Sequence, residues 1–409
     1  MKFKKITINQ WQQFGQIDVE FHNRLTVLTG ANGSGKTTIL NILAKHYGWQ
    51  SQSMATPKMD ILNKAWLWFT GLLGENDGQS ANQIGELVYS DDIKAQLVKP
   101  SNNTAQYQVQ IQNQQTVDCF FIPSHRSVFR YEHLTQIPTQ GTIEKRQAFT
   151  KVANSARHRY FGGDDKPSSF YMKETLVTWN IFGRGNEDME PDSKLLEYYQ
   201  GFEEILHVVL PKEIGFKKFV IRNFEVVLLC DSGDFIIDAA SGGISAIIDM
   251  AWQIFMYSTG KSTDFTVLID EVENHLHPTM QRRILSDFTK AFPEVTFIVS
   301  THSPLIVNSV QDSSVYVLRQ NNEKKFIAEE LDFVNKAKTA AEILDEVLGV
   351  SFTMPIWVEE KLSQILGKYE KEDLTKEETF HNMRSELSQI GLEKLMPEAI
   401  TKLVDKKDA

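Results

Sequence analysis

The sequence predicts an α/β fold with a mixed, mainly parallel β-sheet, an inserted segment and a small helical appendage at the C-terminal end. An apolar strand over residues 24–28 leads directly into a glycine-rich loop and a helix over 38–44. Two more apolar strands, at 265–269 and 295–300, are separated by a helix over 278–292. This strand-helix-strand order is typical of parallel sheets, whose strands need crossover connections.

The N-terminal part contains two further strand-like runs, at residues 5–8 and 17–21. From about residue 50 to 115 the composition becomes polar and rich in Gln, Asn and Ser, which indicates the first part of an insertion. Within it we expect an aromatic helix over 61–73 and a β-hairpin over 107–116.

The middle of the chain alternates between strand and helix signals. Residues 119–123 form a short apolar strand, and residues 142–179 are predicted to be helical with a break at the Gly/Asp/Pro-rich stretch 162–167. Three strands and a helix are expected to follow, at 216–221, 225–230, 234–238 and 244–256.

These signals divide the chain into three regions. Residues 1–50 and 215–320 carry the core pattern, residues 51–214 form an inserted helical and β-rich lobe, and residues 334–409 are rich in Lys and Glu and predicted to be helical. With 409 residues, the chain is long enough for one large domain with an insertion.

The charge and cysteine content narrow the function classes. A formal net charge of −10 means that the protein as a whole repels nucleic acid and anionic membranes, so any DNA contact needs a local patch. Both cysteines, Cys119 and Cys230, lie in apolar runs, which suits buried free thiols in a reducing compartment. Neither a signal peptide nor a membrane span is evident, so we expect a cytoplasmic protein without a membrane partner.

The loop over residues 30–37 reads GANGSGKT and fits the pattern G-x-x-x-x-G-K-[ST] between a strand and a helix. Its glycines let backbone N–H groups turn toward a phosphate, Lys36 can reach the β- and γ-phosphate oxygens, and Thr37 can bind Mg²⁺. A chance match in a glycine-rich turn is the alternative. The predicted nucleotide-binding residues for ATP are Gly30, Asn32, Gly33, Ser34, Gly35, Lys36, Thr37 and Thr38.

Two acids and a histidine follow later strands. Asp270 and Glu271 end the strand at 265–269, where Asp270 is predicted to hold Mg²⁺ and Glu271 to act as the general base; a solvated strand cap is the alternative. His302 follows the strand at 295–300 and is predicted to contact the γ-phosphate, although a single histidine there could also serve a turn or the core.

The segment Ser241, Gly242 and Gly243 precedes a helix and offers a second anion site. Because the chain already has one phosphate loop, we expect this segment to contact the nucleotide held by a second copy of the chain. A simple glycine-rich helix cap is the alternative.

In their order along the chain, these motifs resemble those of the ABC ATPase superfamily. The sequences around Asp270 and His302 are similar to those of its RecF/SMC/OLD branch. The resemblance implies a P-loop ATPase head that pairs head to head, as a homodimer or a higher even-numbered oligomer. It departs from the family at Ala240 and Ile244 beside the signature segment. Ser124 to Arg126 stand where the family's glutamine is expected.

No Asp-x-Asp pair follows Pro304, which argues against an intrinsic Toprim nuclease, and no long coiled coil is evident. The layout resembles ATPase components of antiphage systems such as Septu, PARIS and retrons. We therefore expect an ATP-gated sensor or scaffold that controls a separate effector, an HNH or Toprim nuclease or another toxin. The alternative is a RecF-like repair ATPase that binds DNA directly, whose activity duplex DNA would stimulate.

Basic and aromatic residues alternate between residues 145 and 161. This pattern can mark a contact with nucleic acid or a phage protein acting as trigger. We favour the alternative that these residues form an ordinary solvated helix face in an acidic protein.

Overall fold

The computed structural model describes residues 1–60, 65–69, 83–100, 105–126, 128–138, 145–160, 166–258, 264–307, 309–332, 342–343, 356–369, 377–389, 391 and 393. Contacts within the chain separate two compact units, Met1–Ile343 and Leu344–Ala409. All the motifs discussed above belong to the first unit.

A six-stranded sheet forms the centre of the first unit, in the order β11-β15-β16-β3-β17-β18. Its first five strands are parallel, and β18 pairs antiparallel with β17 at the edge. Strands β3, β15 and β16 are buried along their whole length, as expected for parallel strands covered on both faces. The predicted mixed, mainly parallel α/β fold is confirmed. The strands are β11 (Cys119–Ile122), β15 (Thr266–Ile269), β16 (Thr296–Thr301), β3 (Leu25–Gly30), β17 (Ser314–Gln320) and β18 (Phe326–Glu330).

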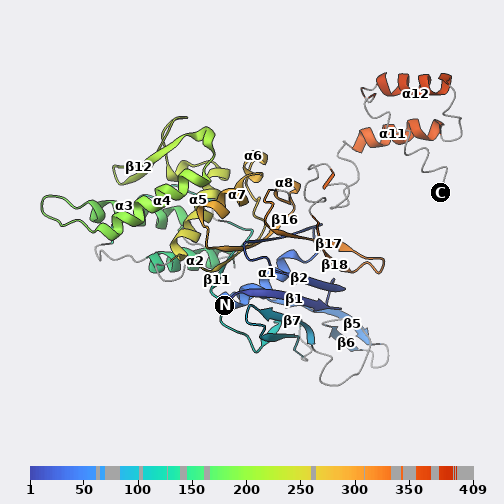
Figure 1. Ribbon diagram of the computed structural model, residues 1–409, viewed down its shortest axis with the longest axis horizontal. Coiled ribbons are helices and arrows are strands. Elements are labelled where there is room, and N and C mark those ends of the chain that lie inside the picture. The colour runs from blue at the N-terminus through green and yellow to red at the C-terminus, as the bar shows by residue number, and fades with distance from the viewer. Residues whose placement is uncertain are drawn as a thin grey trace. The chain divides into compact units, whose positions relative to one another are not determined.

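A second, antiparallel sheet lies beside the first, in the order β10-β8-β7-β1-β2 (Figure 1). One hydrophobic core joins Ile6 and Ile8 of this sheet to Leu28 and Ile298 of the first and to Ile39 of α1. The glycine-rich loop therefore starts from a strand with support on both sides. The elements are β1 (Phe3–Asn9), β2 (Gln16–Glu20), β7 (Gln83–Tyr89), β8 (Lys94–Val98), β10 (Gln110–Gln112) and α1 (Lys36–Ala44), which is followed by η1 (Lys45–Tyr47).

Two local predictions in the polar segment are wrong. Part of the helix expected over residues 61–73 is strand β6 (Ala65–Phe69), which pairs with β5 (Thr56–Asp60); residues 61–64 and 70–73 lie outside the described part. The hairpin expected over 107–116 does not form. Strand β9 (Gln106–Tyr107) pairs with β4 (Ser53–Met54), whereas β10 pairs with β8.

Strands from the segment predicted to be an inserted lobe thus pair within both main sheets, because β7 joins β1 and β11 joins β15. The boundaries proposed for the three regions stay predictions.

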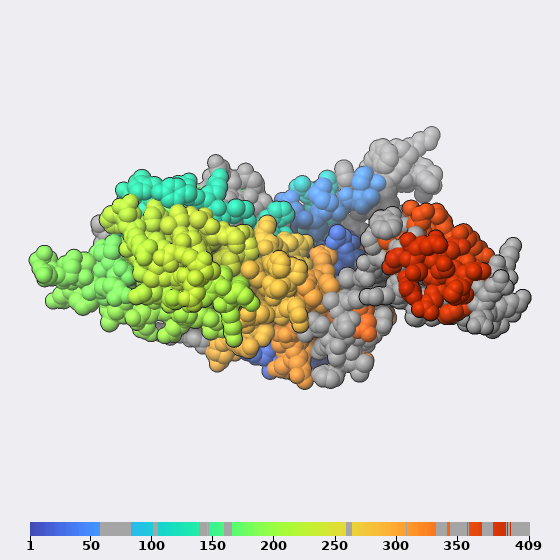
Figure 2. Space-filling view, turned by 90° about the horizontal axis from the view of Figure 1, so that it is seen from above, coloured from blue at the N-terminus to red at the C-terminus, as the bar shows by residue number. Residues whose placement is uncertain are grey.

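A helical lobe follows β11 in the chain (Figure 1), and aromatic rings pack against one another inside it. The centre of the Trp252 ring lies 5.6 Å from the centre of the Trp179 ring and 4.8 Å from the centre of the Phe202 ring. Figure 2 shows the part of this lobe from α3 to α5 in green to yellow beside the orange segment that follows it in the chain. Its elements are α2 (Lys145–Tyr160), α3 (Ser168–Arg184), α4 (Ser193–Val209), η2 (Lys212–Ile214), β12 (Phe216–Arg222), β13 (Glu225–Cys230), β14 (Phe235–Ile236), η3 (Ile237–Ala239) and α5 (Gly242–Tyr257).

Short helices connect the last strands of the first unit. The helix predicted over 278–292 is interrupted, since α6 (Pro278–Gln281) and α7 (Ile284–Ala291) are separate, and α8 (Pro304–Val307) follows β16. In the second unit, α11 (Ile356–Tyr369) and α12 (Glu377–Gln389) are joined by an ion pair of 2.7 Å between Lys368 and Glu386. Among the described residues, no helix combines the length and apolar character that a membrane crossing requires.

Candidate functional site

The loop over residues 30–35 connects β3 to α1 and depends on three glycines with positive φ. Gly30 has φ +142° and Gly35 φ +101°, and Gly33 has φ +76° with nothing near the position of a Cβ. A Cβ on Gly35 would lie 2.2 Å from the Phe14 ring, and one on Gly30 would lie 2.4 Å from the Leu318 carbonyl oxygen. The loop conformation therefore excludes side chains at its two ends.

Lys36 begins α1, and its ammonium group lies inside this loop. It donates hydrogen bonds to the carbonyl oxygens of Gly30 at 2.9 Å and Ala31 at 3.1 Å. Burial lowers the pKa of Lys36 to about 8, although nearby carboxylates led by Asp270 oppose the shift. A positive charge at the N-terminal end of a helix, encircled by backbone, is suited to bind a phosphate chain.

Thr37 and Asp270 form the second part of the site. The Thr37 hydroxyl donates to both carboxylate oxygens of Asp270, at 3.1 and 3.0 Å. Ser300, from the end of β16, donates to Oδ1 of Asp270 at 2.5 Å, and burial raises the pKa of the Asp270 carboxyl. A hydroxyl and a buried carboxylate in contact fit Mg²⁺, which takes one or two protein ligands and completes its shell with phosphate and water.

Two side chains lie next to the Glu271 carboxylate, one of them within hydrogen-bond distance. Asn274 donates to Oε2 of Glu271 at 2.7 Å, and the Nε2 atom of His302 lies 3.8 Å from Oε1. On its other side, Nδ1 of His302 lies 3.4 Å from the Lys36 ammonium nitrogen. Glu271 also has φ +46°, a strained conformation for a residue with a side chain, and such strain is concentrated at functional sites.

Glu273 is a component of this site that the sequence did not reveal. Its Oε1 atom accepts a hydrogen bond of 2.5 Å from the backbone N–H of His302. Its Oε2 atom is buried and has no hydrogen-bond partner among the described residues. Glu273 thus ties the turn after β15 to the turn after β16. The segment over residues 270–278 that carries the family resemblance includes Glu273, but nothing in the sequence assigned it a role.

Arg126 binds the backbone of the turn that follows β15. Its guanidinium group donates to the carbonyl oxygens of Asp270 at 3.1 Å, Glu271 at 2.8 Å and Asn274 at 3.2 Å. Burial lowers its pKa to about 10. Arg126 belongs to the segment Ser124 to Arg126, in which the resemblance predicts a glutamine. Asn274 also contacts this segment, since it donates to the Ser124 carbonyl at 3.2 Å.

The structure brings Lys36, Thr37, Asp270, Glu271 and His302 together, because they follow β3, β15 and β16 at one edge of the sheet. The exposed loop residues Asn32 and Gly33 and the buried Ser34 lie in the same loop. Their roles in nucleotide binding remain predictions.

The signature segment lies elsewhere, at the N-terminal end of α5. Ser241 is the N-cap residue, its side chain makes no cap hydrogen bond, and both Ser241 and Gly242 are exposed. Gly243 faces inward: a Cβ there would lie 3.1 Å from both the His275 carbonyl oxygen and the Met280 sulfur. The signature segment thus packs against the chain that leaves the Asp270–Glu271 pair.

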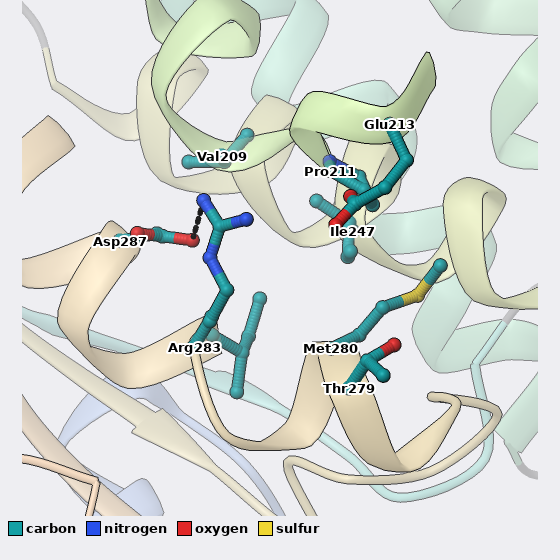
Figure 3. Close-up of a pocket in the computed structure, with 9 residues that line it drawn as sticks. Val209, Pro211, Glu213, Ile247, Thr279, Met280, Arg283 and Asp287 are labelled. Atoms are coloured by element: carbon teal, nitrogen blue, oxygen red, sulfur yellow. Dashed lines mark ion pairs between the residues drawn. The ribbon is translucent and has the colours of Figure 1, made fainter.

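A pocket lies between α4, η2, α5, α6 and α7, and Met280, which also faces Gly243, is one of its lining residues (Figure 3). Met280 and Ile247 line one side, and an ion pair of 3.3 Å between Arg283 and Asp287 closes the other. The Met280 side chain therefore has free space on its pocket side. It also contacts the signature segment at Gly243.

Three basic residues of α2 contact other groups of the chain itself. The Lys145 ammonium lies 3.5 Å from the centre of the Phe255 ring, and Lys151 pairs with Glu174 at 3.4 Å. Arg157 lies over the Trp49 ring and donates to the Gly48 carbonyl oxygen. These contacts favour a structural role for the three cations rather than a role in binding nucleic acid. The side chains of residues 146 and 159 lie outside the described part.

Comparison with known families gives two matches. Residues 5–207 match a family described as "AAA domain", and residues 139–308 match one described as "AAA domain, putative AbiEii toxin, Type IV TA system". Between them, the two matched regions contain the phosphate loop, the acidic pair and His302.

Individual relatives cover only parts of the chain. Septu protein PtuA of Bacillus mycoides (strain KBAB4) is 31% identical over 134 residues, which are 32% of this chain and 18% of the relative. Retron Ec83 probable ATPase of Escherichia coli is 25% identical over 193 residues, 43% of this chain and 34% of the relative. The chain thus spans well under half of the length of either protein.

Among solved structures, the SMC head domain from Thermotoga maritima aligns with a TM-score of 0.43 at 15% identity, over 81% of this chain and all of that one. The two family matches include the residues that form the site. The chain is thus similar to AAA-domain families over residues 5–207 and 139–308, and in part to Septu PtuA and to a retron ATPase.

Proposed function

We propose that this chain binds and hydrolyses Mg-ATP at the site around Lys36, and that a second copy completes the site. The observation that carries this proposal is the convergence of Lys36, Thr37, Asp270, Glu271 and His302 at one sheet edge while Ser241 stays exposed. In the proposed site these five residues would form one half, and the exposed Ser241 would supply the other half to the partner.

Each of these residues has a contact that suits its proposed task. Bound ATP would supply the phosphoanhydride bond, and Mg²⁺ would neutralise part of its charge. Lys36 would bind phosphate oxygens, and Thr37 with Asp270 would hold the metal. Glu271, oriented by Asn274, would accept a proton from water, and His302 would donate to the terminal phosphate.

Ser241 suits a trans role because of its position. It starts the 16-residue helix α5, whose N-terminal dipole favours anions, and its hydroxyl is free of any cap bond. In a head-to-head dimer, this end of α5 would face the triphosphate held by the partner. The assembly is therefore a homodimer or a higher even-numbered oligomer.

For the biological role, we propose an ATP-gated sensor or scaffold in antiphage defence that controls a separate effector. The support is similarity to Septu PtuA and the Retron Ec83 probable ATPase. The effector would be an HNH or Toprim nuclease or another toxin, and a phage protein or nucleic acid would be the trigger. A RecF-like DNA clamp receives no specific support, since the described cations of α2 are engaged in packing.

The dimer can be tested with Glu271→Gln, which keeps the shape of the side chain but removes its charge. Hydrolysis should fall about 10²–10⁴-fold, as expected for loss of a general base. With Mg-ATP, this variant should elute from a sizing column as a dimer. Adding Ser241→Arg should leave it monomeric with unchanged nucleotide affinity, and adding Lys36→Ala should abolish binding. A dimer that forms despite Ser241→Arg would exclude the trans role.

The pKa of Lys36 predicts a pH dependence. Below pH 8 the ammonium is already charged, so the affinity for ATP should be flat. Above pH 8 binding must take up a proton, and the affinity should fall up to about tenfold per pH unit. Titration with a fluorescent ATP analogue between pH 7.5 and 9.5, against Lys36→Arg as a control that stays charged, measures this. A slope shared by both proteins would assign the effect to another group.

The defence role predicts a phenotype in a host that carries the neighbouring genes. Lys36→Ala should lose protection, measured as the efficiency of phage plating, whereas Lys151→Ala, far from the phosphate loop in sequence, should keep it. Duplex DNA should leave the ATPase rate of the purified protein unchanged. Protection by Lys36→Ala, or strong stimulation by DNA, would contradict the proposal and favour the repair alternative.

A further inference from the structure

Lys173 of α3 is a buried lysine that the nucleotide site does not use. Its side chain is fully enclosed, with 0% exposed. Its ammonium group donates to the Asp238 carboxylate at 2.6 Å, the Glu225 carboxylate at 2.9 Å and the Glu132 carbonyl oxygen at 2.5 Å. The three partners come from three different parts of the helical lobe, so Lys173 is the point at which they are joined.

Stability alone does not account for this cluster. Removing charges from water costs several kcal/mol per ion, and well-packed apolar residues often replace buried ion pairs without loss. Burial opposes the charge of Lys173, but the bonds to Asp238 and Glu225 raise its pKa above the ordinary value. The network therefore keeps a charged lysine in the interior. Because such a charge needs all of its hydrogen bonds, the network specifies one relative position of the three partner segments.

One partner leads directly to the signature segment. Asp238 belongs to η3, three residues before Ser241, and its side chain is also 0% exposed. Lys173 binds Oδ2 of Asp238, and Oδ1 has no hydrogen-bond partner among the described residues. From η3 the chain turns at Ala240 and enters α5 at Gly242. The bond to Lys173 thus holds the turn that presents Ser241.

The other partners lead toward the nucleotide site. Glu132 lies six residues after Arg126, whose guanidinium binds the backbone of Asp270 and Glu271. Tyr131, next to Glu132, donates to Oε1 of Glu225 at 3.2 Å, and its ring lies 4.9 Å from the Lys173 ammonium. A shift of the segment after Arg126 would therefore move the carbonyl that Lys173 binds.

We infer that Lys173 is a positioning residue that sets the signature turn against the segment around Glu132, which follows Arg126. Occupation of the chain's own nucleotide site is thereby coupled to the presentation of Ser241 to the partner's nucleotide. This inference rests on the proposed trans function of Ser241.

The test is Lys173→Met, which keeps much of the length and removes the charge, in the Glu271→Gln background. Nucleotide affinity of the subunit, measured with a fluorescent ATP analogue, should change less than about twofold. The concentration needed for ATP-dependent dimerisation, measured by analytical ultracentrifugation, should rise at least tenfold. Lys151→Met, which breaks the half-exposed pair with Glu174, is the matched control and should leave both unchanged.

A second variant separates positioning from stability. Lys173→Met leaves two carboxylates without their cation, and adding Asp238→Asn removes the charge of the fully buried one, so the melting temperature should largely recover while dimerisation stays weak. Recovery of both, or normal dimerisation by Lys173→Met, would overturn the inference. Failure of the proposed function would look different, because Glu271→Gln alone would then bind no ATP or stay monomeric.

Discussion

The parallel pairing of β15, β16 and β3 is the constraint on which the rest of this site depends. Ile269 pairs with Val299, and Val299 pairs with Val27, so the three strands end at one edge of the sheet. This register lets Thr37 reach Asp270, Ser300 reach Asp270, and His302 lie between Lys36 and Glu271. A change of register in any one strand would separate these groups.

Around that edge, secondary contacts hold the acidic turn from several sides. Glu273 binds the backbone of His302, Asn274 binds the Glu271 carboxylate, and Arg126 binds the carbonyls beneath both acids. The turn is strained at Glu271, so these bonds offset a conformation that the backbone alone would not favour. The Glu271 carboxylate and its turn are therefore oriented by contacts within the chain itself.

The same turn is connected to the signature segment by two routes within one chain. Gly243 packs against the His275 carbonyl and Met280, and Lys173 joins the segment after Arg126 to Asp238. If Ser241 serves the partner's nucleotide, both routes link one nucleotide site to the other. The helical lobe then acts as the rigid part that carries the signal between them.

The sequence predicted the parts whose signals are local. The loop over 30–37, the pair Asp270 and Glu271, and His302 could be placed because each follows a strand directly, and the mixed α/β fold is confirmed. The helix over 61–73 and the hairpin over 107–116 were wrong, since short strands such as β6 and β9 are decided by pairing partners rather than by local periodicity.

The supporting residues could not be predicted, because their partners are distant in the chain. Arg126 lies 144 residues from Asp270, and Lys173 lies 65 residues from Asp238. A lone arginine or lysine in the sequence carries no signal of such a bond.

Mixing two inactive variants tests the central claim most directly. In Lys36→Ala the phosphate loop is lost, and in Ser241→Arg the signature is lost, so each protein alone should be inactive. If the site is shared between subunits, a mixed dimer contains one site with both halves intact, and ATPase activity should reappear on mixing. A mixture as inactive as its components would show that the two halves do not meet across subunits.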